Sequence, residues 1–347
     1  MDPLAASVAR SPELFPLVLD PATDQLTFIR LSEAEYQRAS FLDARVLTPK
    51  TPQRALHGSI VEAAVAALPV TANYIFHIGH VGSTLLSRLL GSRPEVFALR
   101  EPAILRTFAH MRFDTQNPWH GWSDAEFDAR LGTVLKLLSR TFRPEQRALV
   151  KTTSFVSELA RQILARPDRP RAIFIFVPAE TYLATILGAS NSPKEARLLA
   201  ESRLARLHAR SGGAHWRLPD LSEGEMVAMS WACEVAVLAA AAEEAKDQVL
   251  WLNFDEFLED PARWLGAAFT HIGIETASAQ ISAILSGPDM GRYAKAPEHP
   301  YDARLRGAVL RDARRDRARQ IAKGLRWLKE AEIMAPALQQ VFTSVTN

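Results

Sequence analysis

The fold is decided by residues 74–90, with the sequence YIFHIGHVGSTLLSRLL. The first five residues form a nearly continuous apolar run, which is typical of a strand covered by helices on both faces. The glycine-rich turn 79–84 follows, and the apolar spacing after it predicts an amphipathic helix. Free backbone N–H groups at the start of such a helix can bind an anion, and glycine lets the anion approach them. The stretch therefore predicts a phosphate-binding turn, although an ordinary tight turn also favours Gly and Ser.

The turn differs from the nucleoside-triphosphate loop in one position. That loop needs a lysine between its last glycine and its Ser or Thr, to reach the β- and γ-phosphates. In this chain Gly82 is followed directly by Ser83 and Thr84. We therefore expect a ligand other than a magnesium-bound triphosphate.

Four more short apolar runs follow the pattern of residues 74–78, and helical patterns follow most of them. Because each run is continuous rather than alternating, both faces of its strand are expected to be covered. Alternation of strands and helices predicts an α/β fold with a five-stranded parallel sheet. The predicted strands are 74–78, 96–99, 148–150, 172–177 and 249–252, and the predicted helices are 84–92, 102–111, 155–165, 179–189 and 261–271.

The rest of the chain is interpreted as additions to this core. Residues 1–70 contain a hairpin-like start at 26–31 and then helices, and form a lead segment packed on the core. The α/β core spans 71–272 and carries a helical insertion at 190–246. Residues 273–347 form a C-terminal helical segment that completes the same domain. Ser-x-x-Glu patterns at Ser32, Ser123 and Ser222 predict three helix starts.

Composition excludes several classes of protein. Of the 347 residues, 48% are hydrophobic and 23% are charged, which excludes a disordered chain. The single cysteine, Cys233, excludes an intrachain disulfide and a cysteine metal cluster. A net charge of +2 gives no reason to expect nucleic acid as a partner. No targeting segment and no membrane span is recognised, so a cytoplasmic location is expected.

Three motifs occur in order along the predicted core: GHVGSTLL at 79–86, SRPEV at 92–96 and REP at 100–102. With this order the sequence resembles the sulfotransferase superfamily. Two looser matches are LVKTT at 149–153 and WLNFDEFLEDP at 251–261. The resemblance covers roughly residues 73–272.

The resemblance implies a P-loop-like core in which the five strands are arranged in the order 2-3-1-4-5. It also implies that the protein is an enzyme, a transferase of sulfur-containing groups. The sulfuryl donor would be 3′-phosphoadenosine 5′-phosphosulfate (PAPS), and the acceptor a hydroxyl or amine on a small molecule, glycan or peptide. No metal is expected, because His77 and His80 lack a third ligand nearby and His77 is expected to be a core histidine. A homodimer is left open.

The resemblance also assigns residues to the donor, with two departures from the family pattern. His80 stands where the family usually has Arg or Lys, and Pro178 where it has the arginine for the 3′-phosphate. Thr185 or Ser190 would replace the family's serine. Arg292 and Lys295 supply cations from a C-terminal loop, or else are exposed loop charges. The predicted donor-binding residues are Gly79, His80, Val81, Gly82, Ser83, Thr84, Leu85, Thr185, Ser190, Arg292 and Lys295.

Three residues are predicted to take part in catalysis. Glu101 follows the second strand at the sheet edge where α/β proteins bind ligands, and a carboxylate there suits a general base. Alternatively, the Glu101 carboxylate only stabilises the N-terminus of the helix that begins beside Pro102, by interacting with the helix dipole. Lys151 and His80 are predicted to stabilise charge on the donor, unless Lys151 merely pairs with an acid.

Two other functions remain open at this stage. One is a nucleotide-dependent phosphotransferase, similar to a kinase, on the same fold. The other is a degenerate nucleotide-binding protein without catalytic activity. Binding of adenosine 3′,5′-bisphosphate compared with ATP-Mg²⁺ distinguishes the first alternative from sulfuryl transfer.

Overall fold

The computed structural model describes residues 3–113, 121–212, 215–296, 298–335 and 338–339. A five-stranded parallel sheet forms its centre, with the order β5-β6-β4-β7-β8. This is the order 2-3-1-4-5 that the resemblance implied, so the predicted α/β fold class and strand order are confirmed. The strands are β4 (Asn73–His77), β5 (Val96–Arg100), β6 (Arg147–Lys151), β7 (Ala172–Phe176) and β8 (Val249–Asn253).

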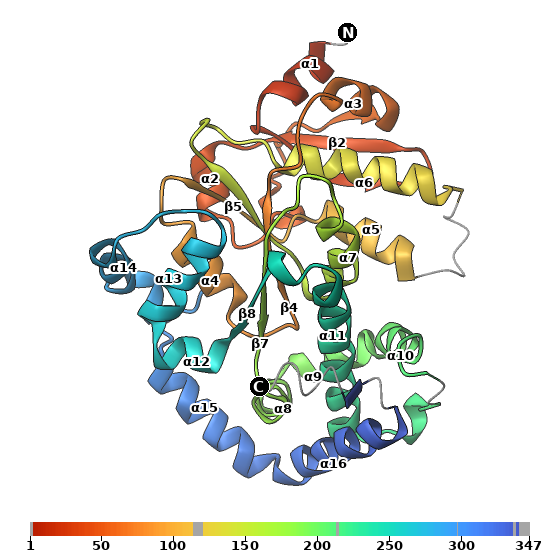
Figure 1. Cartoon of the computed structure of the whole chain (residues 1–347), viewed down its shortest axis with the longest axis vertical. Helices are drawn as coiled ribbons and strands as arrows, with labels where there is room; N and C mark the ends of the chain where they lie inside the picture. Colours follow the sequence, from red (N-terminus) through yellow and green to blue (C-terminus); the bar gives the residue numbers. More distant parts are fainter. Residues whose placement is uncertain (1–2, 114–120, 213–214, 297, 336–337, 340–347) are drawn as a thin grey trace.

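Helices cover both faces of this sheet, as the continuous apolar runs predicted. In Figure 1, α4, α12 and α13 lie on one side of the sheet, and α7 and α11 on the other. Every residue of β4, β5 and β7 is buried, which explains why these strands show no apolar–polar alternation. The helices around the sheet are α4 (Ser83–Leu90), α5 (Ile104–Phe113), α7 (Ala160–Leu164), α8 (Ala179–Gly188), α12 (Phe254–Glu259) and α13 (Pro261–His271).

The N-terminal segment forms a second sheet, three-stranded and antiparallel, with the order β1-β2-β3. The hairpin of β1 and β2 matches the predicted start, but β3 was predicted as part of a helical region. β3 has only four residues and three of them are exposed, so it carries no apolar run of its own. Pairing with β2 makes it a strand. The elements are α1 (Pro3–Arg10), β1 (Leu14–Asp20), β2 (Gln25–Arg30), α2 (Glu33–Arg38), β3 (Arg54–His57), α3 (Gly58–Val65) and α6 (Asp124–Leu138).

The insertion between β7 and β8 is helical, as predicted. It consists of α9 (Ser192–Leu198), α10 (Ala200–His208) and α11 (Glu223–Glu244). α11 is long and apolar enough to cross a membrane, but 83% of its most apolar window is buried inside the fold, as in a core helix. Its buried Glu234 pairs with Arg203 and Arg206 of α10, which ties the insertion together.

The C-terminal segment runs along the helices α8 and α11. It contains α14 (Ser278–Leu285), α15 (Ala303–Asp316) and α16 (Ala318–Met334). α15 packs on α8, and α16 packs on α11 and α8. The loop 286–302 reaches α4, where Arg88 Nε donates to the Ala294 carbonyl at 2.8 Å. This contact carries Arg292 and Lys295 to the beginning of α4.

Candidate functional site

The turn between β4 and α4 has a backbone that glycine makes possible. Gly79, His80 and Gly82 all have positive φ, at +92°, +55° and +73°. Gly82 is also the N-cap of α4, and a Cβ there would stand 2.0 Å from Cζ of Phe254. Position 82 therefore needs glycine for its dihedral angle and for the close packing of Phe254.

The ring of His77 supports the start of this turn. Nδ1 accepts the Gly79 N–H at 3.0 Å, so Nε2 carries the ring proton and donates to the Thr152 carbonyl at 2.9 Å. Burial holds the pKa of His77 well below its usual value, and the nearby charge of Lys151 adds to this. His77 is thus the neutral core histidine that the sequence predicted.

The N-terminus of α4 has unused hydrogen-bonding groups. No side chain caps it among the described residues, and the N–H groups of its first turn have no acceptors within the helix. The Thr84 side chain is buried, and its Oγ1 has no hydrogen-bond partner in the described part of the chain. An unsatisfied buried hydroxyl costs about 1–3 kcal/mol. An anion bound at this point would satisfy both the hydroxyl and the N–H groups.

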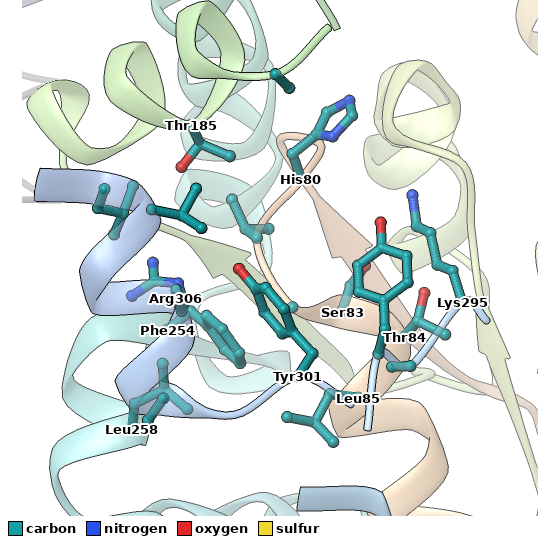
Figure 2. A pocket seen from close by; sticks show the side chains of 18 of the residues that line it. His80, Ser83, Thr84, Leu85, Thr185, Phe254, Leu258, Lys295, Tyr301 and Arg306 are labelled. Atoms are coloured by element: carbon teal, nitrogen blue, oxygen red, sulfur yellow. The ribbon is translucent and has the colours of Figure 1, made fainter. Parts of the chain in front are cut away.

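A cavity of about 620 Å³ opens from the turn (Figure 2). Its other walls are formed by α8, α9, α12, α15 and the loop between α14 and α15. Two of the predicted donor-binding residues do not line it. Ser190 is exposed beyond the end of α8. The backbone N–H of Gly79 donates to the His77 ring, behind the turn. The predicted residues that do line it are His80, Val81, Gly82, Ser83, Thr84, Leu85, Thr185, Arg292 and Lys295.

Aromatic rings form one wall of the cavity. Phe254, Tyr293 and Tyr301 line it, and the two tyrosine rings lie 5.5 Å apart between centroids. In Figure 2 the Tyr301 ring stands in the space between Arg306 and Ser83. Flat aromatic side chains of this kind suit a heterocyclic base.

Cations outnumber carboxylates along the cavity lining. Arg292 and Lys295 have no ion pair with any described residue, so their charges are available to a ligand. Arg306 donates to Asp255 at 2.6 Å, and its guanidinium lies 5.5 Å from the centre of the Phe254 ring. The Thr185 hydroxyl donates to the Thr181 carbonyl at 2.8 Å, so it faces a ligand mainly as an acceptor.

Sequence reasoning missed several cavity residues, among them Glu195, Tyr301 and Arg306. Arg306 belongs to a strongly basic stretch, in which ten of the residues from 304 to 329 are Lys or Arg. Nothing in its spacing shows which arginine turns inward, because that depends on how α15 packs on α8. Glu195 lies in the helical insertion, 115 positions from His80 of the turn, so no local pattern connects the two.

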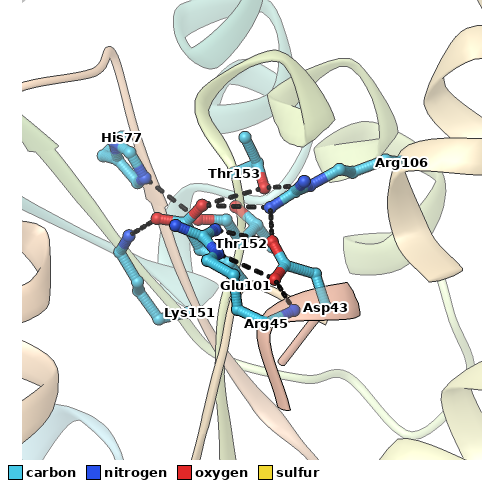
Figure 3. A network of polar contacts seen from close by, with 8 residues as sticks. All are labelled: Asp43, Arg45, His77, Glu101, Arg106, Lys151, Thr152 and Thr153. Atoms are coloured by element: carbon cyan, nitrogen blue, oxygen red, sulfur yellow. Dashed lines mark hydrogen bonds and ion pairs between the residues drawn. The ribbon is translucent and has the colours of Figure 1, made fainter. Parts of the chain in front are cut away.

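Glu101 and Lys151 lie in a separate buried network (Figure 3). The Lys151 ammonium, which is fully buried, donates to Glu101 Oε1. Glu101 Oε2 accepts from Thr153 at 3.2 Å and from Arg106 at 3.4 Å. Arg106 also pairs with Asp43 at 3.2 Å. Burial lowers the pKa of Lys151 to about 8, although the Glu101 carboxylate opposes this shift.

This network lies beside the cavity, and neither Glu101 nor Lys151 lines it. Phe41 links the two regions, because the Arg45 guanidinium stacks 3.4 Å from its ring centre and the Lys295 ammonium lies 5.8 Å from it. Lys151 pairs with the carboxylate of Glu101, which is the alternative that the sequence analysis gave for it. Glu101 has a strained backbone at φ +52°, a feature found most often at functional positions.

Within the described ranges, no three His, Cys, Asp or Glu side chains form a group that could hold a metal ion.

Comparisons with known proteins give matches only among solved structures. No protein-family model matches the chain, and no curated protein matches it. The chain is similar to the sulfotransferase domain from the curacin biosynthetic pathway, with 10% identity and a TM-score of 0.43 over 71% of this chain and 97% of that one. It is similar to the sulfotransferase domain of the Synechococcus PCC 7002 olefin synthase, with 12% identity and a TM-score of 0.41 over 80% and 94%. A third similar structure is retinol dehydratase in complex with androsterone and the inactive cofactor PAP, with 14% identity and a TM-score of 0.37 over 96% and 94%.

Proposed function

We propose that the protein binds 3′-phosphoadenosine 5′-phosphosulfate in the cavity and transfers its sulfuryl group to a hydroxyl or amine. One observation carries the proposal: an uncapped helix N-terminus with a buried, unpartnered Thr84 hydroxyl opens into a cavity with aromatic rings and unpaired cations. The volume of about 620 Å³ falls within the range of small-molecule sites. The absence of a lysine in the turn favours this ligand over a nucleoside triphosphate.

The residues divide the work between base and phosphates. Tyr293 and Tyr301 would flank the adenine, and Arg292 and Lys295 would neutralise phosphate charge. The N–H groups of residues 83–85 and the Thr84 hydroxyl would hold the phosphosulfate. These donors are fixed before the ligand arrives, so they stabilise developing charge without reorganising.

The transfer itself needs a proton acceptor. As the bond between sulfur and the leaving phosphate oxygen breaks, a new bond forms between sulfur and the acceptor oxygen or nitrogen. Glu101 would take the proton that the acceptor loses, while Lys151 and Arg106 hold its carboxylate in place. His80 and Lys295 would stabilise the charge that gathers on the leaving phosphate.

Ligand preference tests the proposal directly. We expect adenosine 3′,5′-bisphosphate to raise the melting temperature, adding about 2.7 kcal/mol of stability at about 100 times its dissociation constant. ADP and ATP-Mg²⁺ should bind more weakly, because they lack the 3′-phosphate. Calorimetric titration and thermal unfolding with the three nucleotides measure this. Equal stabilisation by ADP would contradict the proposal, and preference for ATP-Mg²⁺ would favour a phosphotransferase.

Removal of an unpaired cavity cation should weaken the nucleotide selectively. Arg292→Ala is expected to raise the dissociation constant of adenosine 3′,5′-bisphosphate roughly 10- to 150-fold, because a charged hydrogen bond contributes about 1.5–3 kcal/mol. Arg304→Ala is the matched control, since Arg304 is exposed on α15 and does not line the cavity. Calorimetric titration of both variants with adenosine 3′,5′-bisphosphate measures the two dissociation constants. Equal losses of affinity would mean that Arg292 acts only through long-range charge and not through a contact with the nucleotide.

A further inference from the structure

The side chain of His80, within the turn, is held by the helical insertion. His80 Nε2 lies 3.2 Å from Glu195 Oε2 on α9, and both residues line the cavity. The His80 side chain is 26% exposed, so solvent protons reach it. A residue 115 positions away thus fixes the orientation of the imidazole at the phosphate-binding turn.

This contact decides what the other ring nitrogen offers. In the neutral ring Nε2 carries the proton that Glu195 accepts, so Nδ1 is left as a bare lone pair. No described residue forms a hydrogen bond with Nδ1. A bare lone pair repels a phosphate or sulfate oxygen. Only the imidazolium form presents a second N–H, with which the ring donates to Glu195 and to an anion at the same time.

The charges around the pair keep Glu195 ionised. The hydrogen bond from His80 lowers the pKa of the Glu195 carboxyl, and the charges of Arg203 and Lys295 lower it further. Lys151 and the neutral His77 lie behind the turn, and Arg292, Arg306 and Asp302 line the same cavity. Glu195 is the carboxylate in contact with His80, so it is the group that favours protonation of the ring.

We propose that binding of an anionic ligand in this cavity takes up one proton at His80, and that Glu195 is the positioning residue for this step. The inference rests on the proposed function, because it needs an anionic nucleotide at the turn. The proton comes from the solvent and adds to Nδ1, while Nε2–H stays on Glu195. Above the pH at which free His80 titrates, affinity for the anion then falls by up to tenfold per pH unit.

Proton uptake can be measured without knowing the acceptor. Adenosine 3′,5′-bisphosphate is titrated at pH 7.5 in buffers of different ionisation enthalpy, and the dependence of heat on buffer gives the number of protons taken up. We expect the wild type to take up close to one proton more than His80→Gln. A His80→Lys variant carries a permanent charge, so its uptake should match that of His80→Gln while its affinity stays high.

Glu195 is tested by a second readout that needs no ligand. An NMR titration of the His80 ring, assigned by comparison with His80→Gln, gives its midpoint in the free protein. Glu195→Gln should lower this midpoint, because the ring loses the carboxylate that accepts its Nε2–H, and Glu195→Asp should restore part of it. Arg197→Gln is the matched control, because Arg197 lies on the same helix and pairs instead with Glu223.

The outcomes separate the two proposals. If the nucleotide binds with the same proton uptake in wild type and His80→Gln, the inference is wrong and the proposed function stands. If the nucleotide does not bind at all, both are overturned. An unchanged His80 midpoint in Glu195→Gln overturns the role of Glu195. Equal shifts in Glu195→Gln and Arg197→Gln would also overturn it.

Discussion

Glu101→Gln is expected to lower the free energy of unfolding by about 3 kcal/mol or more, because it leaves the Lys151 ammonium buried without its carboxylate. Lys151 has no exposed surface and donates to Glu101, so no solvent replaces the lost partner. Urea denaturation of the two proteins measures the difference. Lys151→Met should cost less, because Glu101 keeps Arg106 and Thr153 as partners.

A double variant separates this structural role from catalysis. Glu101→Gln with Lys151→Met removes both charges, so most of the lost stability should return. Turnover should nevertheless stay about 10²- to 10⁴-fold below the wild type if Glu101 is the general base. Release of adenosine 3′,5′-bisphosphate from the phosphosulfate donor, with a panel of phenols and amines as acceptors, reports turnover. A stable double variant with normal turnover would show that Glu101 takes no proton.

Gly82→Ala is expected to cost more than about 3 kcal/mol of stability and to abolish nucleotide binding. A left-handed backbone costs a non-glycine residue about 1–2 kcal/mol. At Gly82 the new Cβ would also stand 2.0 Å from Cζ of the buried Phe254, so the ring or the turn must move. Either movement displaces the N–H groups that the ligand needs.

Gly212→Ala is the matched control for the second effect. Gly212 has a similar φ of +66°, and a Cβ there would meet no atom of the described residues within 4 Å. Its variant should lose only the backbone contribution and keep its affinity for adenosine 3′,5′-bisphosphate. Thermal unfolding and titration of both variants measure the two effects. Equal destabilisation of the two proteins would show that contact with Phe254 does not constrain the turn.

The sequence by itself determined the central sheet and the turn beside it. Each predicted core strand occurs within a few residues of its predicted bounds, because a strand buried on both faces needs a continuous apolar run. The helix starts at Ser32, Ser123 and Ser222 also occur where the capping patterns placed them. Such signals involve residues near one another in the chain, so they can be interpreted without the fold.

Only the tertiary structure decided which side chains meet. β3 has no apolar pattern and exists because β2 offers it hydrogen bonds. His80 meets Glu195 across 115 residues, and Arg88 holds the loop at Ala294 across 206. Glu101 follows β5 and Lys151 ends β6, and the pairing of these two strands makes the residues an ion pair beside the cavity. Contacts between residues so far apart in the chain depend on how whole helices pack. The sequence around a charged residue therefore does not show which partner the residue will have.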